Sequence, residues 1–209
     1  MILWRPVGLN EMALVFDSGM AAFPPRLPEQ PIFYPVLNKD YAVQIARDWN
    51  TKESPFAGYV LRFEITDNYA TTFETRTVGG GIHRELWIPA ERLAEFNAQI
   101  IGPIVTAQAF FGKNFRGFIP DAYGLKGLDA FEQIAALAAT MDYAIMDFGM
   151  EIMANAKTIF LNFPFWKAAG SLRLNIEADP LNRCLEKIRS VWSMSPRGAE
   201  LVEDAAFIE

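Results

Sequence analysis

The chain has 209 residues, a formal net charge of −6 at pH 7, and 51% hydrophobic against 21% charged residues. This composition excludes wholesale disorder, and the length suffices to bury a core. The negative balance argues against nucleic acid or an anionic membrane as the main partner, since phosphate groups are bound through Lys and Arg. One cysteine and one histidine exclude an intrachain disulfide framework and a Cys/His zinc site.

A Mg²⁺ or Ca²⁺ site built from carboxylates alone stays compatible with the composition, but the sequence has no Asp-rich loop of the calcium-binding type, so we expect no metal. Arg5, Pro6 and Asn10 interrupt the apolar stretch that a signal peptide would need at the start of the chain. No run of apolar residues approaches the length of a membrane span. We therefore expect a soluble, cytoplasmic protein.

The spacing of apolar residues predicts alternating strands and helices in the first half of the chain. In chain order these are a strand at 2–7, a helix at 9–18, an extended loop with four prolines at 23–31, a strand at 32–36 and a helix at 39–49. The chain continues with a strand at 58–65, a strand or extended arm at 69–78, a triple-glycine turn at 79–81, a strand at 85–88, a short helix at 89–96 and a strand at 100–111.

Residues 112–127 are rich in Gly, Pro and aromatic residues and are predicted to connect two subregions. The elements predicted after them are a long helix at 128–154, two strands at 158–166 and 172–177, and a last helix from 179 to 192. The long helix is expected to turn one apolar face inward, formed by Ile134, Leu137, Met141, Ile145, Phe148 and Ile152. Its Asp147 and Glu151 lie one turn apart and are expected on a solvated face.

Three residues of the first half carry a family resemblance. Arg5 lies on the opening strand, Tyr34 precedes a predicted helix, and Glu85 lies on a late strand. With this order of elements, residues from about 1 to 111 resemble the ADP-ribosyltransferase fold. The block Arg-Leu-Pro-Glu-Gln-Pro-Ile-Phe-Tyr-Pro-Val-Leu-Asn at 26–38 also resembles small bacterial proteins labelled "ADP-ribosylation/crystallin J1".

This resemblance implies the fold class and the domain organisation. Residues 1–111 would form an α+β domain in which a split mixed or antiparallel sheet, with flanking helices, clamps NAD. Residues 112–209 would follow as a C-terminal α+β region of unknown role, made of the long helix, the two strands and the last helix.

The resemblance also implies residues that bind NAD. Arg5 would supply the fixed cation that a pyrophosphate or ribose needs, because a planar guanidinium presents several donors. Arg26, in the proline-rich loop, would reach a phosphate, and Tyr34 would stack on the nicotinamide ring. Each residue also has a structural interpretation: Arg5 paired with a nearby acid, Arg26 solvated, and Tyr34 as one more core aromatic.

Glu85 and His83 are the catalytic candidates. Cleavage of the nicotinamide–ribose bond passes through an oxocarbenium-like state, which a carboxylate near the sugar 2-hydroxyl stabilises. His83 would share the strand face of Glu85 and orient a ribose hydroxyl or shuttle a proton. The structural alternatives are Glu85 paired with Arg84 or Arg62, and His83 without a chemical role.

Three functions are compatible with these patterns. The first is an NAD-consuming mono-ADP-ribosyltransferase acting on an unidentified acceptor, which is favoured by the shared face of His83 and Glu85. The second is a non-catalytic module that keeps the transferase-like scaffold and binds a ligand or a protein. The absence of a Ser-Thr-Ser run, and of a Glu-x-Glu pair before the closing strand, favours the second. In the third, residues 112–209 form an independent interaction domain.

Overall fold

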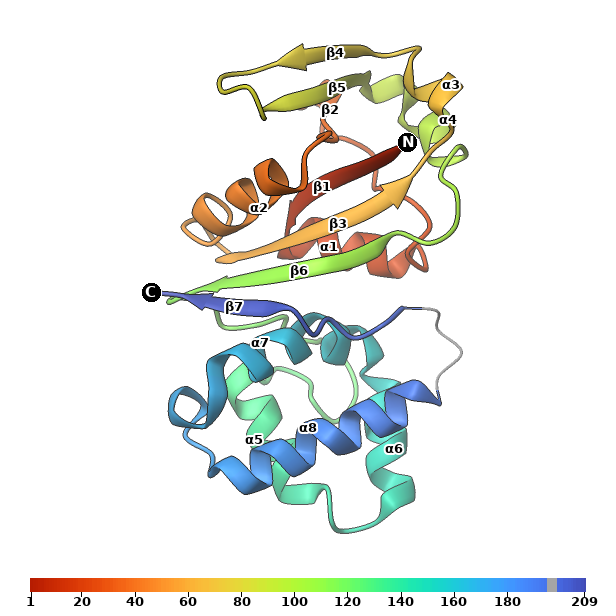
Figure 1. Cartoon of the computed structure of the whole chain (residues 1–209). Helices are drawn as coiled ribbons and strands as arrows, with labels where there is room; N and C mark the ends of the chain where they lie inside the picture. Colours follow the sequence, from red (N-terminus) through yellow and green to blue (C-terminus); the bar gives the residue numbers. More distant parts are fainter. Residues whose placement is uncertain (195–198) are drawn as a thin grey trace.

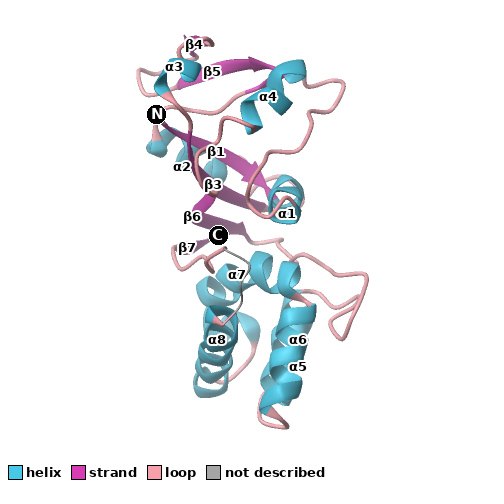
Figure 2. Ribbon diagram, turned by 90° about the vertical axis from the view of Figure 1, so that its right-hand side faces the viewer, coloured by secondary structure: helices cyan, strands magenta, loops and turns pink. Residues whose placement is uncertain are grey.

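The computed structural model describes residues 1–194 and 199–209, and it shows an α+β protein with a mixed sheet (Figures 1 and 2). The predicted α+β class is therefore confirmed. The described elements are β1 (Ile2–Gly8), α1 (Leu9–Asp17), β2 (Ile32–Phe33), α2 (Lys39–Asp48), β3 (Ala57–Glu64), α3 (Asp67–Ala70), β4 (Glu74–Thr77), β5 (Arg84–Pro89), the 3-10 helix η1 (Ala90–Arg92), α4 (Leu93–Asn97), β6 (Val105–Gly112), α5 (Ala130–Thr140), α6 (Ile145–Ala154), α7 (Ala156–Leu174), α8 (Ala178–Ser193) and β7 (Ala205–Ile208).

The strands form two parts. One is a four-stranded sheet in the order β1-β3-β6-β7, antiparallel except for the parallel pair β6 and β7. The other is an antiparallel three-stranded sheet in the order β2-β5-β4. Figure 1 shows helices α5 to α8 gathered on the β6–β7 side, away from β4 and β5. The first half of the chain therefore supplies every described strand except β7. The second half supplies β7 and the helices that lie beside β6 and β7.

In the described part of the chain, the segment around Val36 joins the two parts of the sheet. Val36 exchanges backbone hydrogen bonds with Trp4 of β1, at 2.9 and 2.7 Å, and on its other side it bridges to Glu85 of β5. Strand β2, which precedes Val36, pairs with β5 and not with β1. The residues of β1 that follow Trp4 pair with β3 and not with β2. The two parts of the sheet therefore separate between β1 and β2, and they meet again at Val36.

Helix α2 covers one face of the sheet at close range. Asn38 caps the helix, with its side-chain oxygen accepting from the backbone N–H of Asp40 at 2.8 Å. The buried residues Tyr41 and Ala46 of α2 pack against Val36 and the neighbouring strands. The larger core lies on the opposite face and is continuous from α1 to α8.

Two predicted strands are wrong, because residues 158–166 and 172–177 belong to helices and turns. Most of this stretch is helix α7. Nearly the whole first half of α7 is buried, including Phe160, Phe163 and Trp166, so no polar side marks it as a helix. An apolar run of this kind cannot be assigned to strand or helix by periodicity alone.

The predicted long helix at 128–154 is also interrupted, and it forms α5 and α6. The break follows Met141, whose carbonyl oxygen accepts a hydrogen bond of 2.8 Å from Lys187 Nζ of α8. The expected inward positions are buried except Ile145, which is 85% exposed because the break turns the start of α6 outward.

Strand β7 was not predicted, and it returns the end of the chain to the sheet of the first half. It pairs in parallel with β6, from Ala205 opposite Ala109 to Ile208 opposite Gly112. Side chains from both halves share the large core. The predicted division at residue 111 stays a prediction, while the elements on its two sides pack together.

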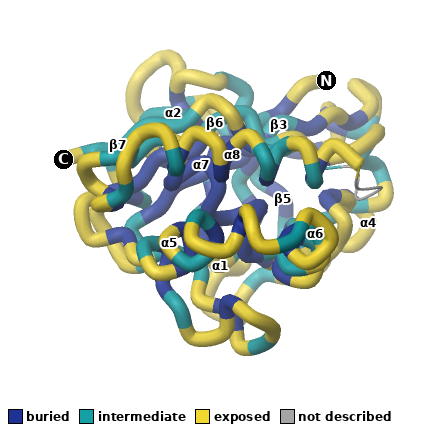
Figure 3. The backbone as a smooth tube through the Cα atoms, turned by 90° about the horizontal axis from the view of Figure 1, so that it is seen from below, coloured by how far each residue is buried: buried dark blue, intermediate teal, exposed yellow. Residues whose placement is uncertain are grey.

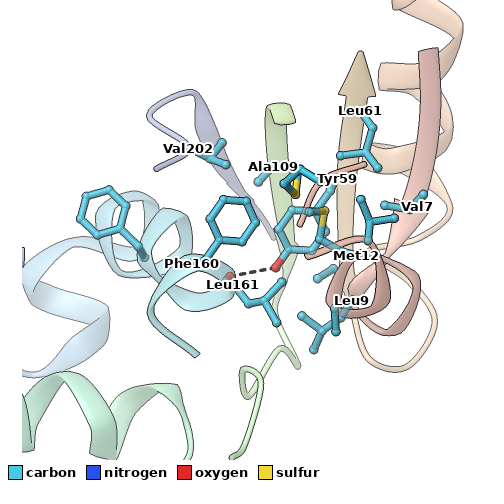
Figure 4. Packing of buried hydrophobic residues seen from close by; sticks show 14 of the residues in the cluster. Val7, Leu9, Met12, Tyr59, Leu61, Ala109, Phe160, Leu161 and Val202 are labelled. Atoms are coloured by element: carbon cyan, nitrogen blue, oxygen red, sulfur yellow. Dashed lines mark hydrogen bonds between the residues drawn. The ribbon is translucent and has the colours of Figure 1, made fainter. Parts of the chain in front are cut away.

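Buried polar contacts fix α7 against its neighbours. Tyr59 of β3 donates a hydrogen bond of 2.9 Å to the carbonyl oxygen of Leu161, inside a cluster of apolar side chains from both halves (Figure 4). The amide of Asn162 donates to Gln133 of α5 at 2.6 Å and to the Phe118 carbonyl oxygen at 2.9 Å. Buried groups satisfied in this way specify one arrangement of the helices.

We expect Gly58→Ala to destabilise the fold by about 1–3 kcal/mol, because the added Cβ would overlap the backbone of Ala46 in α2. Gly81→Ala is the matched control: its Cβ would meet no atom within 4 Å, and its change should stay within about 0.5 kcal/mol. Urea unfolding of both variants measures the difference, and equal losses would contradict the close packing of α2 on β3.

We also expect a pH-dependent contribution from Glu203, which joins α7 and α8. Hydrogen bonds from Arg189, with a further one from Lys167, lower the pKa of Glu203 from 4.5 to about 2. The stabilisation should be complete above the unfolded pKa and be lost as pH falls from about 4.5 to about 2.

Unfolding measurements at pH 7 and pH 3 test this expectation. The stability difference between wild type and Glu203→Gln should shrink at the lower pH, and Glu53→Gln, which removes an exposed carboxylate elsewhere, is measured alongside as a reference. A difference that is independent of pH would show that the ion pairs of Glu203 contribute nothing.

Candidate functional site

Arg5 lies at the split in the sheet and is held by one carboxylate. Its Nε and Nη2 donate to the two carboxylate oxygens of Glu11, both at 3.0 Å, and Nη1 donates to the Tyr34 carbonyl oxygen at 3.1 Å. Its guanidinium carbon lies 4.8 Å from the centre of the Phe33 ring. Glu11 is in reach because α1 begins directly after β1. The expected pairing of Arg5 with a nearby acid is therefore present.

Arg26 brings a second guanidinium to the same carboxylate. Its Nη1 lies 3.6 Å from Glu11 Oε2, and its Nη2 donates to Gln30 at 2.7 Å. The side chain is 10% exposed, and its Nε is buried without a hydrogen-bond partner among the described residues. Burial, followed by the proximity of Arg5, lowers the pKa of Arg26. Two cations thus share one anion, and we name Arg5, Glu11 and Arg26 the arginine cluster.

Glu85 and His83 meet at Tyr41 of α2. The Tyr41 hydroxyl donates to Glu85 Oε1 at 2.9 Å. The His83 ring stacks on the Tyr41 ring with centroids 4.3 Å apart, and its Nε2 lies 3.1 Å from Gln44 Oε1. The partner of Glu85 is therefore Tyr41, and not Arg84 or Arg62. We name Tyr41, Gln44, His83 and Glu85 the Glu85 cluster.

The protonation states in the Glu85 cluster follow from these contacts. The backbone N–H of Gly80 donates to His83 Nδ1 at 3.2 Å, which leaves Nε2 to carry the proton and donate to Gln44. Burial, followed by the hydrogen bond to Glu85, raises the pKa of Tyr41 to about 12. Tyr41 is therefore a neutral donor at physiological pH, and it holds the Glu85 carboxylate in one position.

The two clusters lie on opposite faces of the sheet. Arg5 shares its face with Leu3 on alternate positions of β1, and that face contacts the large core. Glu85 stands opposite Val36 in an antiparallel bridge, so the two side chains share the face that α2 covers through Tyr41. The structure thus brings Arg5 to Arg26, and it brings His83 to Glu85, without gathering all of them round one hollow.

Tyr34 connects the two faces at the split. Its carbonyl oxygen contacts Arg5, and its ring packs edge-on against Trp87, with centroids 5.2 Å apart. Trp87 lies two residues from Glu85 on β5 and therefore on the same face. The Trp87 ring is covered by Arg76 at 3.7 Å, and its Nε1 is buried without a hydrogen-bond partner in the described part of the chain.

Sequence reasoning missed the partners of the predicted residues. Glu11 is an acidic residue in the first turn of a helix, a common position that carries no functional signal by itself. Tyr41 is an aromatic residue on the buried side of α2, where it packs as a core residue, but its hydroxyl also donates to Glu85. The signal that could have found Tyr41 is that a buried tyrosine hydroxyl usually has a partner.

Comparisons with protein-family models, with curated proteins and with solved structures found no significant match for this chain. Over residues 1–194 and 199–209, no helix is long and apolar enough to cross a membrane. Over the same residues, no three His, Cys, Asp or Glu side chains are grouped as metal ligands. We therefore infer function from the two clusters and Tyr34.

We expect Glu11→Gln to destabilise the protein by about 3 kcal/mol, because it leaves two largely buried guanidinium groups facing each other without an anion. Glu95→Gln is the control, since it removes an equally bidentate but exposed pair with Arg92 and should cost much less, because solvent screens exposed charges. Thermal or urea unfolding compares the two variants, and a loss no larger than that of the control would contradict the buried charge excess.

Proposed function

We propose that the protein is an NAD-dependent mono-ADP-ribosyltransferase with a transferase-like fold, acting on an unidentified protein acceptor. The observation that carries the proposal is the charge of the arginine cluster. Two guanidinium groups and one carboxylate leave one positive charge uncompensated, at side chains that are 10% exposed. An unpaired buried positive charge costs free energy, and a bound anion such as a pyrophosphate would offset that cost.

The surroundings of Tyr34 support a dinucleotide as this anion. Two buried N–H groups without partners among the described residues, Arg26 Nε and Trp87 Nε1, could donate hydrogen bonds to oxygen atoms of a ligand. The Tyr34 ring, half-buried beside Trp87, offers an apolar surface for the nicotinamide. A dinucleotide lying across the split would have its diphosphate at the arginine cluster and its nicotinamide ribose toward the Glu85 cluster.

Glu85 would act on the reacting sugar. The bond between nicotinamide and ribose breaks, and nicotinamide leaves with the bonding electron pair. The Glu85 carboxylate stabilises the positive charge that develops on the ribose. A nucleophilic group of the acceptor then bonds to the same ribose carbon and gives up its proton. Tyr41 supports this role because its hydrogen bond keeps the carboxylate in place.

The order of the elements supports the family resemblance. A split mixed sheet is present, with Arg5 on β1, Tyr34 directly after β2 and Glu85 on β5. These are the positions that the resemblance implies for the cation, the stacking ring and the acid. The transferase-like fold is itself part of the proposal. Its support is the shared order of three residues along the chain.

A binding module without catalysis is the second candidate. It is favoured by one observation, namely that Arg5 and Glu85 extend from opposite faces of the sheet. A module of this kind would keep the arginine cluster as a ligand site, and Glu85 would serve only to anchor α2 through Tyr41.

We expect NAD at a hundredfold its dissociation constant to stabilise the wild type by about 2.7 kcal/mol, visible as a rise in melting temperature. Arg26→Met should weaken NAD binding by about tenfold or more, because it removes the uncompensated charge. Lys52→Met, which removes an exposed cation elsewhere, should bind NAD as the wild type does.

Nicotinamide release from NAD then separates the two candidates. In Glu85→Gln it should fall by about 100-fold or more with NAD binding retained, whereas Glu91→Gln, an exposed glutamate just beyond β5, should be fully active. Binding without nicotinamide release in the wild type, with protein acceptors supplied, would favour the binding module. Absence of NAD binding in the wild type would refute both the transferase and the dinucleotide site.

A further inference from the structure

The outer side of helix α6 is apolar. Ile145, Met146 and Met150 are 85%, 75% and 65% exposed, and Tyr143, just before the helix, is 81% exposed. Figure 3 shows exposed stretches of α6 at the surface, while its inner side packs into the core. A helix that is apolar on both sides is normally covered on both. We name Tyr143, Ile145, Met146 and Met150 the α6 surface.

An acidic hollow of about 330 Å³ adjoins the α6 surface. Its apolar lining includes Leu137 and Phe148, and its polar lining includes Tyr143, Asp147 and Glu151. Within the part of the chain that the structure describes, Asp147 forms no ion pair. The hollow thus combines an apolar lining with a carboxylate that no cation of the described chain neutralises.

We propose that the α6 surface and the acidic hollow together bind a basic amphipathic helix of another protein. The apolar face of that helix covers Met146 and Met150, whose flexible thioether side chains adapt to the contours of a partner. A Lys or Arg on the same helix enters the hollow beside Asp147, where its stem contacts the apolar lining and its charge meets the carboxylate. This site is separate from the arginine and Glu85 clusters, and it does not depend on the proposed transferase activity.

Charge selects this occupant over a second copy of the chain. Two copies that met through the α6 surface would bring two Asp147 carboxylates to one interface, and like charges there oppose association. The chain also carries a net charge of −6, which attracts a basic partner and repels another copy. A basic amphipathic helix covers the apolar side chains of the α6 surface and pairs its cations with the carboxylates of the hollow.

Fluorescence anisotropy with two synthetic peptides of about eighteen residues tests the proposal. Both peptides carry Leu at the same helical spacing, and one has Lys and the other Glu at its polar positions. We expect the Leu/Lys peptide to bind the full-length protein and the Leu/Glu peptide to bind at least about tenfold more weakly. The double variant Met146→Ser with Met150→Ser, and separately Asp147→Lys, should each weaken the Leu/Lys complex by about tenfold.

Matched control variants distinguish binding at this site from non-specific binding of the peptide elsewhere on the protein. Leu172→Ser removes a leucine that is 97% exposed on α7, and Glu53→Lys reverses an exposed charge on a distant loop, so both should bind the Leu/Lys peptide as the wild type does. Equal weakening by controls and site variants, or binding of both peptides with one affinity, would overturn the proposal. So would a dimer of the wild type in sedimentation that the Met146/Met150 variant abolishes, because the surface would then belong to a second copy.

Discussion

The buried contact between α7 and the sheet is the constraint on which the rest of the structure depends. Tyr59, fully buried in β3, donates a hydrogen bond from its hydroxyl group to the carbonyl oxygen of Leu161, which lies 102 residues away in the sequence. Burial raises the pKa of Tyr59, so this hydroxyl stays a donor throughout the physiological range. Because β3 lies between β1 and β6, the same contact holds the strand that carries Arg5, and the helices of the second half thereby support the site of the first.

The two clusters differ in their charge and in the face of the sheet on which they lie. The arginine cluster offers charge without a matching anion, and the Glu85 cluster offers a carboxylate fixed by a neutral phenol. These are different electrostatic environments on two faces of the sheet, and Tyr34 contacts Arg5 on one face and Trp87 on the other. In the proposed transferase, affinity for a dinucleotide and the ability to cleave it would be separate properties, each of which could be lost without the other.

Local patterns predicted most elements of the first half, where strands such as β1 and β5 alternate buried with more exposed positions and helix α2 has one buried side. They failed at α7, where burial on nearly all sides removes the periodicity that distinguishes a helix from a strand. They also failed at the break before α6, where the Met141 carbonyl oxygen accepts a hydrogen bond from Lys187, a residue far along the chain. For the site, Arg5 and Glu85 were placed on the correct elements. The sequence could not predict that the two side chains lie on opposite faces of the sheet. That outcome depends on which helix packs on each face, and local patterns do not contain this information.

The joint between the two parts of the sheet is made by main-chain atoms, and this has an evolutionary consequence. The bonds between Trp4 and Val36, and the contact of Arg5 with the carbonyl group of Tyr34, do not depend on which side chains occupy positions 34 and 36. Sequence drift can therefore exchange the polar residues around the split while the scaffold persists. A lineage built on this joint can gain or lose chemistry without rebuilding its architecture.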